Sequence, residues 1–101
     1  RLENFLDAKK HYAKAVEINP NHFAVNNDLG NVYEELGQRD NAEKFYLRAI
    51  ELDPLNASVY ANLGILYHSI NGDIALEYYM KAAQLGDEGI QKWLKDNGYS
   101  W

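Results

Sequence analysis

The chain of 101 residues contains no cysteine, which excludes disulfide bonds, thiolate metal sites and cysteine nucleophiles. Proline occurs only twice, and no apolar run approaches the roughly 20 residues that a membrane-spanning helix needs. Basic residues number 10 against 15 acidic ones, which gives a formal net charge of −5. An acidic chain repels phosphate groups, so nucleic acid and anionic membrane surfaces are both disfavoured as partners.

What is present is enough for one small packed domain. Apolar residues make up 47% of the chain and charged residues 25%, and this balance is typical of a globular protein. Residue 1 is Arg1 rather than methionine, so we expect the natural chain to begin upstream. For that reason the sequence gives no information on a signal peptide.

The sequence repeats itself with a period of 34 residues. The Leu-Gly-x2-Tyr pattern around Gly30 recurs around Gly64, which lies 34 residues later. A second pattern, Ala-x3-Tyr-x2-Ala, begins at Ala8, Ala42 and Ala75. Since the last copy follows after 33 residues rather than 34, we predict a one-residue deletion near Asn71 and Gly72. Recurrence at such a period is typical of helical repeat proteins.

These patterns resemble the tetratricopeptide repeat, which reads W-x2-L-G-x2-Y…A-x3-F…P with a 34-residue period. Pro20 and Pro54 stand at the terminal proline of the first two units. The departures are Asn26 and Tyr60 at the first aromatic position and Asp87 at the third proline position. The last of these suggests that the array is ending.

The resemblance covers Phe5 to about Leu85 and implies an all-α fold, a short right-handed α-solenoid of antiparallel helix pairs. Apolar residues at helical spacing support the same helices independently. We expect helices at Leu2–Ile18, His22–Leu36, Asp40–Leu52, Ala57–Ile70, Asp73–Leu85 and Glu88–Asn97. The last helix should cap the stack through Ile90, Trp93 and Leu94 and stop at Gly98.

We interpret residues 1–101 as a single domain with four parts. They are the second helix of a truncated repeat (1–22), a full repeat (23–56), a full repeat with the deletion (57–87), and a capping helix with a tail (88–101). The stretch from Tyr78 to Asp87 also resembles a Sel1-type repeat, a relative with the same helix-pair architecture.

The glycines predict close helix packing. Gly30 and Gly64 lie inside predicted helices, where each costs roughly 1 kcal/mol relative to alanine. We expect this cost to be offset by close approach to the helix that carries Ala42 or Ala75. Gly37 and Gly72 suit the tight turns between paired helices.

No catalytic motif accompanies the repeat. The sequence lacks G-x-S-x-G and any glycine-rich phosphate loop. Three histidines, His11, His22 and His68, show no metal-ligand spacing. We therefore predict a non-enzymatic protein without a metal ion or cofactor.

The resemblance implies that the first helix of each pair lines a concave, peptide-binding face. We predict that this face contains Asn27, Asn31, Glu34, Asn62, Ile65 and His68. An asparagine both donates and accepts, so Asn31 and Asn62 can hold a peptide backbone, while Glu34 selects a cationic side chain. The predicted partner is a neutral or basic peptide or protein.

Some relatives clamp a peptide's terminal carboxylate with asparagines and lysines. Asn31 and Asn62 match the asparagine positions of that clamp. Asn27 and Ser58 stand where its lysines would be needed. Without these cations the carboxylate would lose its charge-assisted bonds, so we reject this ligand.

Self-association is the alternative function. Phe5, Leu6 and Tyr12 form an apolar stripe on a helix that lacks its expected partner helix. An unpartnered stripe tends to find a partner, and a second copy of the chain could supply it as a homodimer.

Overall fold

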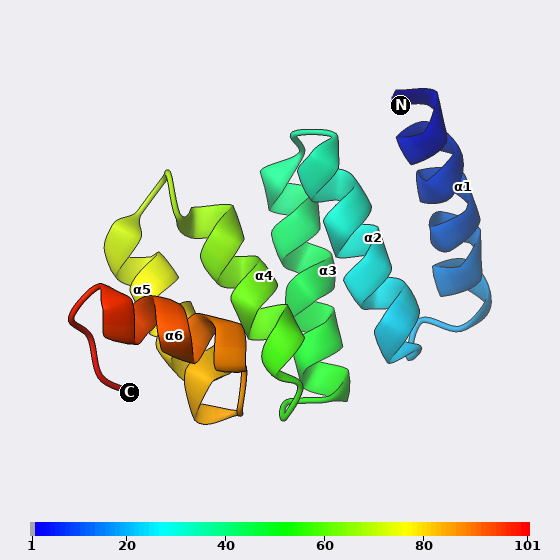
Figure 1. Cartoon of the computed structure of the whole chain (residues 1–101). Coiled ribbons are helices and arrows are strands. Elements are labelled where there is room, and N and C mark those ends of the chain that lie inside the picture. The colour runs from blue at the N-terminus through cyan, green and yellow to red at the C-terminus, as the bar shows by residue number, and fades with distance from the viewer. Residues whose placement is uncertain (1) are drawn as a thin grey trace. The chain divides into compact units, whose positions relative to one another are not determined.

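The computed structural model describes the backbone of residues 2–101 and the side chains of Asn4 and residues 6–101. Within that part of the chain, the regular secondary structure consists of α-helices without strands (Figure 1). The helices are α1 (Leu2–Ile18), α2 (Phe23–Glu35), α3 (Arg39–Leu52), α4 (Ala57–Tyr67), α5 (Gly72–Gln84) and α6 (Glu88–Asp96). The predicted all-α helical-repeat fold is confirmed.

The chain divides into two compact units, the first ending at Pro54 and the second beginning at Leu55. In the first unit, α2 packs against both α1 and α3, and successive helices run in opposite directions (Figure 1). Its fully buried side chains include Leu29, Tyr46 and Ala49. The first unit is therefore a helical hairpin of α2 and α3 with α1 against α2.

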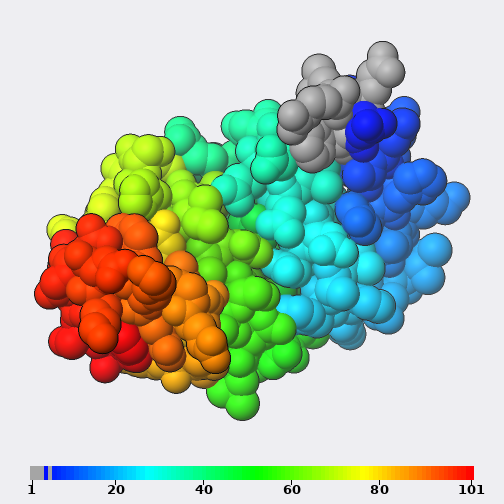
Figure 2. Space-filling view, in the orientation of Figure 1, coloured from blue at the N-terminus to red at the C-terminus, as the bar shows by residue number. Residues whose placement is uncertain are grey.

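In the second unit, α5 packs against both α4 and α6. The core around α5 consists of Ala75, Tyr79, Ala83 and Leu94. In Figure 2, α6 in orange and the C-terminal residues in red cover much of this unit from the viewer's side. The predicted cap is formed mainly by Leu94, because Trp93 keeps 38% of its surface exposed.

The repeated glycines lie directly against a tyrosine ring of the paired helix. A Cβ atom at Gly30 would lie 2.5 Å from a ring carbon of Tyr46, and one at Gly64 would lie 2.5 Å from a ring carbon of Tyr79. Real Cβ atoms essentially never come so close to another carbon. Each glycine thus makes room for a tyrosine of the following helix. This is the helix that carries Ala42 or Ala75, to which a close approach was predicted.

The turns between paired helices differ in the two units. Gly37 has a φ of +76° and ends α2, where its N–H donates to the Glu34 carbonyl at 3.0 Å. The predicted turn role of Gly72 is wrong, because Gly72 is the first residue of α5 and has no positive φ. Asn71 takes over that role, since its Oδ1 accepts from the N–H groups of Asp73 and Ile74.

This capping also explains why α4 is shorter than predicted. A side chain at the N-cap position stabilises the start of a helix by satisfying free N–H groups. Because Asn71 caps the start of α5, residues 68–70 form a turn, and α4 ends at Tyr67 rather than Ile70. The predicted ends at Ile18 and Leu52 are confirmed, and each lies two residues before a proline.

Asn26, at the position of the repeat's first aromatic, fixes the loop that precedes α2. Its side chain is 1% exposed, and Nδ2 donates to the carbonyls of Pro20 at 3.1 Å and His22 at 2.8 Å. Its Oδ1 is buried without a hydrogen-bond partner in the described part of the chain. Asn26 therefore replaces the packing of an aromatic ring with two hydrogen bonds to the loop.

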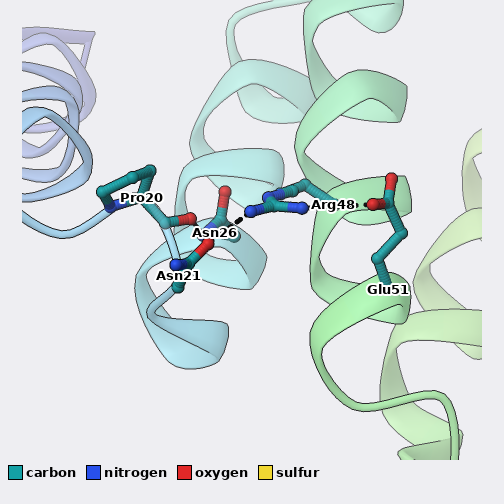
Figure 3. A network of polar contacts seen from close by, with 5 residues as sticks. All are labelled: Pro20, Asn21, Asn26, Arg48 and Glu51. Atoms are coloured by element: carbon teal, nitrogen blue, oxygen red, sulfur yellow. Dashed lines mark hydrogen bonds and ion pairs between the residues drawn. The ribbon is translucent and has the colours of Figure 1, made fainter.

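A polar network connects the same loop to α3 (Figure 3). The Arg48 guanidinium donates to Asn21 Oδ1 and forms an ion pair with Glu51 at 3.1 Å. Since Arg48 and Glu51 are both substantially exposed, the ion pair itself contributes little to stability. Together with Asn26, the network keeps the loop close to α2 and α3.

Candidate functional site

The predicted binding residues fall into two sets, one in each unit. They are Asn27, Asn31 and Glu34 on α2, and Asn62, Ile65 and His68 on α4 or directly after it. Within each unit, the three residues follow one another along one side of the first helix of the pair.

Accessibility differs along each set. Asn31 and His68 are exposed, and Ile65 is 54% exposed. Asn27 and Asn62 are half-buried, and each already has an interaction partner. Asn31 and Ile65 follow Gly30 and Gly64 directly, so they occupy the same position of the repeat and are both open to a ligand.

In the first unit, the Tyr46 hydroxyl connects the core to this surface. It lies 2.5 Å from Asn31 Oδ1 and 2.7 Å from Glu34 Oε1. A hydroxyl has one proton, so the two oxygens compete for it, and a deprotonated Glu34 is the stronger acceptor. Asn31 can therefore turn toward a ligand while Tyr46 keeps a hydrogen bond.

The protonation of this pair is shaped by its partial burial. Burial raises the pKa of Glu34 above its usual 4.5, although the Tyr46 hydrogen bond lowers it and the charge of Glu35 raises it further. Burial and the neighbouring glutamates strongly raise the pKa of Tyr46. Tyr46 consequently stays a donor, and Glu34 is a carboxylate held in a less hydrated position than an ordinary surface glutamate.

The second unit repeats this arrangement with different chemistry. His68 stands four residues after Gly64, as Glu34 stands four residues after Gly30, and its Nδ1 lies 3.2 Å from the Tyr79 hydroxyl. Both predicted residues therefore contact the tyrosine that packs against the repeat's glycine. The sequence pattern did not indicate these hydroxyl contacts of Tyr46 and Tyr79, although Glu34 and His68 stand at the same distance from a glycine.

A second feature, which the sequence analysis did not predict, is a pocket in the second unit. Its volume is about 260 Å³. Four aromatic rings contribute to its lining, His68, Tyr79, Trp93 and Tyr99. Gly72, Asp73, Ala75 and Leu76 complete it. Of the residues predicted for the binding face, only His68 reaches this pocket.

Two further features are absent from the described part of the chain. Among these residues, no group of three or more histidines, aspartates or glutamates is arranged to hold a metal ion. None of the described helices combines the length and apolar character needed to cross a membrane.

Antiparallel helix pairs, the 34-residue recurrence and the glycine–tyrosine contact define the chain as a helical repeat protein. The family model of the tetratricopeptide repeat matches residues 2–68, and the chain belongs to this family. Members of the family typically act as non-enzymatic modules that mediate protein–protein interaction. None of the curated proteins matches this chain.

Among solved structures, the crystal structure of a protein called MamA is similar to this chain. The TM-score is 0.78 and the sequence identity is 24%. The match covers 87% of this chain but 52% of the MamA chain, so this chain spans about half of that structure. At this identity, the similarity establishes the fold alone.

Proposed function

We propose that this chain binds a neutral or basic peptide segment of a partner protein through the exposed side of the first helix of each pair, α2 in the first unit and α4 in the second. The observation that supports this proposal most directly is the accessibility of Asn31 and Ile65 at the same repeat position. The asparagine offers a donor and an acceptor to a peptide backbone, and the isoleucine offers an apolar contact. Asn31 also lies 2.5 Å from the hydroxyl of Tyr46 in its own unit.

Charge supports the preference for a neutral or basic ligand. The chain carries a net charge of −5, and Glu34 lies on the same side of α2 as Asn31, next to Glu35. An acidic peptide would place like charges against these carboxylates. A cationic side chain would instead meet Glu34, whose partial burial weakens its screening by water.

The remaining predicted residues take supporting roles in this proposal. Asn27 and Asn62 are half-buried and already engaged, so they shape the surface more than they bind the ligand. His68 contacts Tyr79 and is exposed, and it offers a polar edge at the end of α4. Direct recognition therefore falls mainly to Asn31, Glu34 and Ile65.

The test uses an array of unstructured peptides that are matched in length and differ in net charge. Neutral and basic peptides should be retained, acidic ones should not, and salt should weaken the binding of basic peptides. Ile65→Ser should reduce retention, whereas the matched control Ile18→Ser, at a position that is 78% exposed on α1, should not. Preferential retention of acidic peptides, or equal effects of both substitutions, would contradict the proposal.

A second candidate function, self-association through α1, has its own supporting observation. Leu6 is 41% exposed, and Ala8, Tyr12 and Ala15 are only partly buried. Their repeat equivalents on α3, Ala42, Tyr46 and Ala49, are fully buried. Phe5, the other residue of the predicted stripe, has a side chain outside the described residues.

Light scattering over a range of protein concentrations distinguishes this candidate from the first. Association through α1 should appear as a mass that rises with concentration and returns to that of a monomer in Leu6→Lys. A monomer at all concentrations would remove the second candidate and leave the peptide-binding proposal intact. Association unchanged by Leu6→Lys would place the contact elsewhere and equally reject this candidate.

A further inference from the structure

The pocket of the second unit is built around one ring, that of Trp93. The centroid of Trp93 lies 5.1 Å from Tyr79, 6.1 Å from His68 and 6.4 Å from Tyr99. The Tyr99 ring is almost parallel to Trp93, at 17°, whereas the Tyr79 and His68 rings are inclined to it at 49° and 69°. The lining therefore presents ring faces in more than one direction.

The chain returns to this pocket because of its last turn. Gly98 has a φ of +83°, and the N–H of Tyr99 donates to the Leu94 carbonyl at 2.9 Å. This turn reverses the chain after α6 and brings Tyr99 back onto Trp93. Trp93 and Tyr99 nevertheless remain 38% and 44% exposed, so their rings stay accessible to a ligand.

The charge of the lining favours a cation. Asp73 is the only residue of the lining with a full negative charge, and the lining contains no lysine or arginine. The start of α5 is not available for an anion, because Asn71 Oδ1 already accepts from the N–H groups of Asp73 and Ile74. Aromatic faces carry partial negative charge and attract cations as well.

The kind of cation follows from the small number of hydrogen-bond acceptors in the pocket. A bare ammonium group has three N–H donors and is strongly hydrated, so it needs several acceptors to leave water. Here the Tyr79 hydroxyl and His68 Nδ1 already contact each other, which leaves the Asp73 carboxylate as the main acceptor. A trimethylated ammonium group has no N–H donors to satisfy and meets ring faces through its methyl groups.

We propose that this pocket binds a trimethylammonium group, held by the faces of Trp93 and Tyr99 and by the charge of Asp73. The proposal does not rest on the peptide-binding face of α2 and α4, with which it shares only His68. Such a group occurs in choline-type molecules and in trimethylated lysine side chains. The two sources share the chemistry that the pocket recognises.

The first experiment tests the charge and the source of the ligand. Choline, its neutral isostere 3,3-dimethylbutanol, and a short peptide with and without a trimethylated lysine are titrated into the protein to about 10 mM, which reaches saturation for a dissociation constant near 1 mM. Binding is followed by ligand-observed NMR of the methyl signal. Choline and the trimethylated peptide should bind, and the isostere and the unmodified peptide should bind at least about tenfold more weakly.

The relative affinity of choline and the trimethylated peptide identifies the source. Equal affinities would mean that the pocket reads the trimethylammonium group alone, and a stronger peptide would mean that it reads a modified partner protein. Both outcomes support the pocket's ligand class. Equal binding of the neutral isostere, or no saturable binding of either cation, would overturn the proposal.

The second experiment tests the location. The chain has two tryptophans, so Trp101→Phe leaves Trp93 as the single tryptophan reporter, and choline should change its fluorescence. Trp93→Leu should reduce choline binding about tenfold, Trp93→Phe should retain most of it, and Asp73→Asn should weaken it several-fold. Circular dichroism checks that each variant is folded.

Because Trp93→Leu also alters the packing of α6, Asp73→Asn serves as the variant that leaves the rings in place. Unchanged affinity in a folded Asp73→Asn variant, together with unchanged fluorescence of Trp93 in Trp101→Phe, would overturn the assignment of this pocket.

Discussion

Replacing Gly30 by alanine is the most direct perturbation of the contact on which both units are built. The new Cβ would lie 2.5 Å and 2.6 Å from two ring carbons of Tyr46. Carbon atoms in ordinary van der Waals contact lie at least about 3.5 Å apart, so the ring or the helix has to move by about 1 Å. Tyr46 is fully buried, and its hydroxyl donates to Glu34 or Asn31, so the ring has little freedom to turn away.

The expected magnitude is the difference of two effects. Overpacking of a well-packed core typically costs about 1–3 kcal/mol. Alanine gains about 1 kcal/mol over glycine inside a helix. The contact of 2.5 Å with a fully buried ring puts Gly30→Ala in the upper part of that cost range, at about 2–3 kcal/mol. After the gain from alanine, we expect Gly30→Ala to lower the free energy of unfolding by about 1–2 kcal/mol. Gly64→Ala should cost less, because Tyr79 is 6% exposed and has more room to move.

Urea unfolding followed by circular dichroism measures these differences at equilibrium. Gly72→Ala is the matched control, because a Cβ at Gly72 has no neighbouring atom within 4 Å, and its midpoint should stay the same or rise slightly. In a Tyr46→Leu background, Gly30→Ala should lose most of its cost, since the ring is gone. A Gly30→Ala variant as stable as the wild type would refute the close-packing argument.

Substitutions at three further positions test other features of the structure. Asn71→Ala should lower the free energy of unfolding by about 1 kcal/mol through loss of the α5 cap, as measured by urea unfolding, and Asn71→Asp should retain most of it. Asn26→Asp should lower the free energy of unfolding by about 1–3 kcal/mol more than Asn26→Leu does, because the carboxylate of the new aspartate would face two carbonyl oxygens. If Asn26→Leu had the lower urea midpoint, the role assigned to Asn26 in the loop would be contradicted. The wild type should lose stability as the pH rises from 4.5 through the raised pKa of Glu34, and Glu34→Gln should not show this loss. The folded state binds the Glu34 proton more tightly than the unfolded state does, because the pKa of Glu34 is raised on folding. Ionisation of Glu34 at higher pH therefore lowers the free energy of unfolding. Unfolding at several pH values checks this, and a Glu34→Gln variant less stable than the wild type at neutral pH would contradict it.

The sequence predicted the fold well because the repeat carries its own packing rules. The period predicted which residues share a helix face, and the glycines predicted where helices touch. The predicted end of α4 was wrong because the apolar pattern continues to Ile70. In the structure, Asn71 caps the start of α5, and this cap determines where the turn lies. Helix ends depend on such local competition more than on periodicity.

The candidate site was less predictable, for a different reason. Glu34 and His68 were identified from the face on which they lie. Their contacts with tyrosines 12 and 11 residues away depend on the tertiary pairing of two helices. The aromatic pocket depends on a turn at Gly98 that brings Tyr99 onto Trp93, and no periodic pattern extends that far. Contacts made after a chain reversal lie beyond what spacing within a helix can predict.

The tyrosine of the repeat joins stability and recognition in the same side chain. Its ring packs against the glycine of the preceding helix, and its hydroxyl reaches the residue four positions after that glycine. The ring therefore fixes the helix pair, while the outer residue, glutamate in one unit and histidine in the other, is free to vary. Because the hydroxyl both donates and accepts, it can pair with a carboxylate or an imidazole without any change in the core. This arrangement explains how neighbouring repeats keep one packing scheme while they present an acidic group in one unit and an aromatic, polar group in the other.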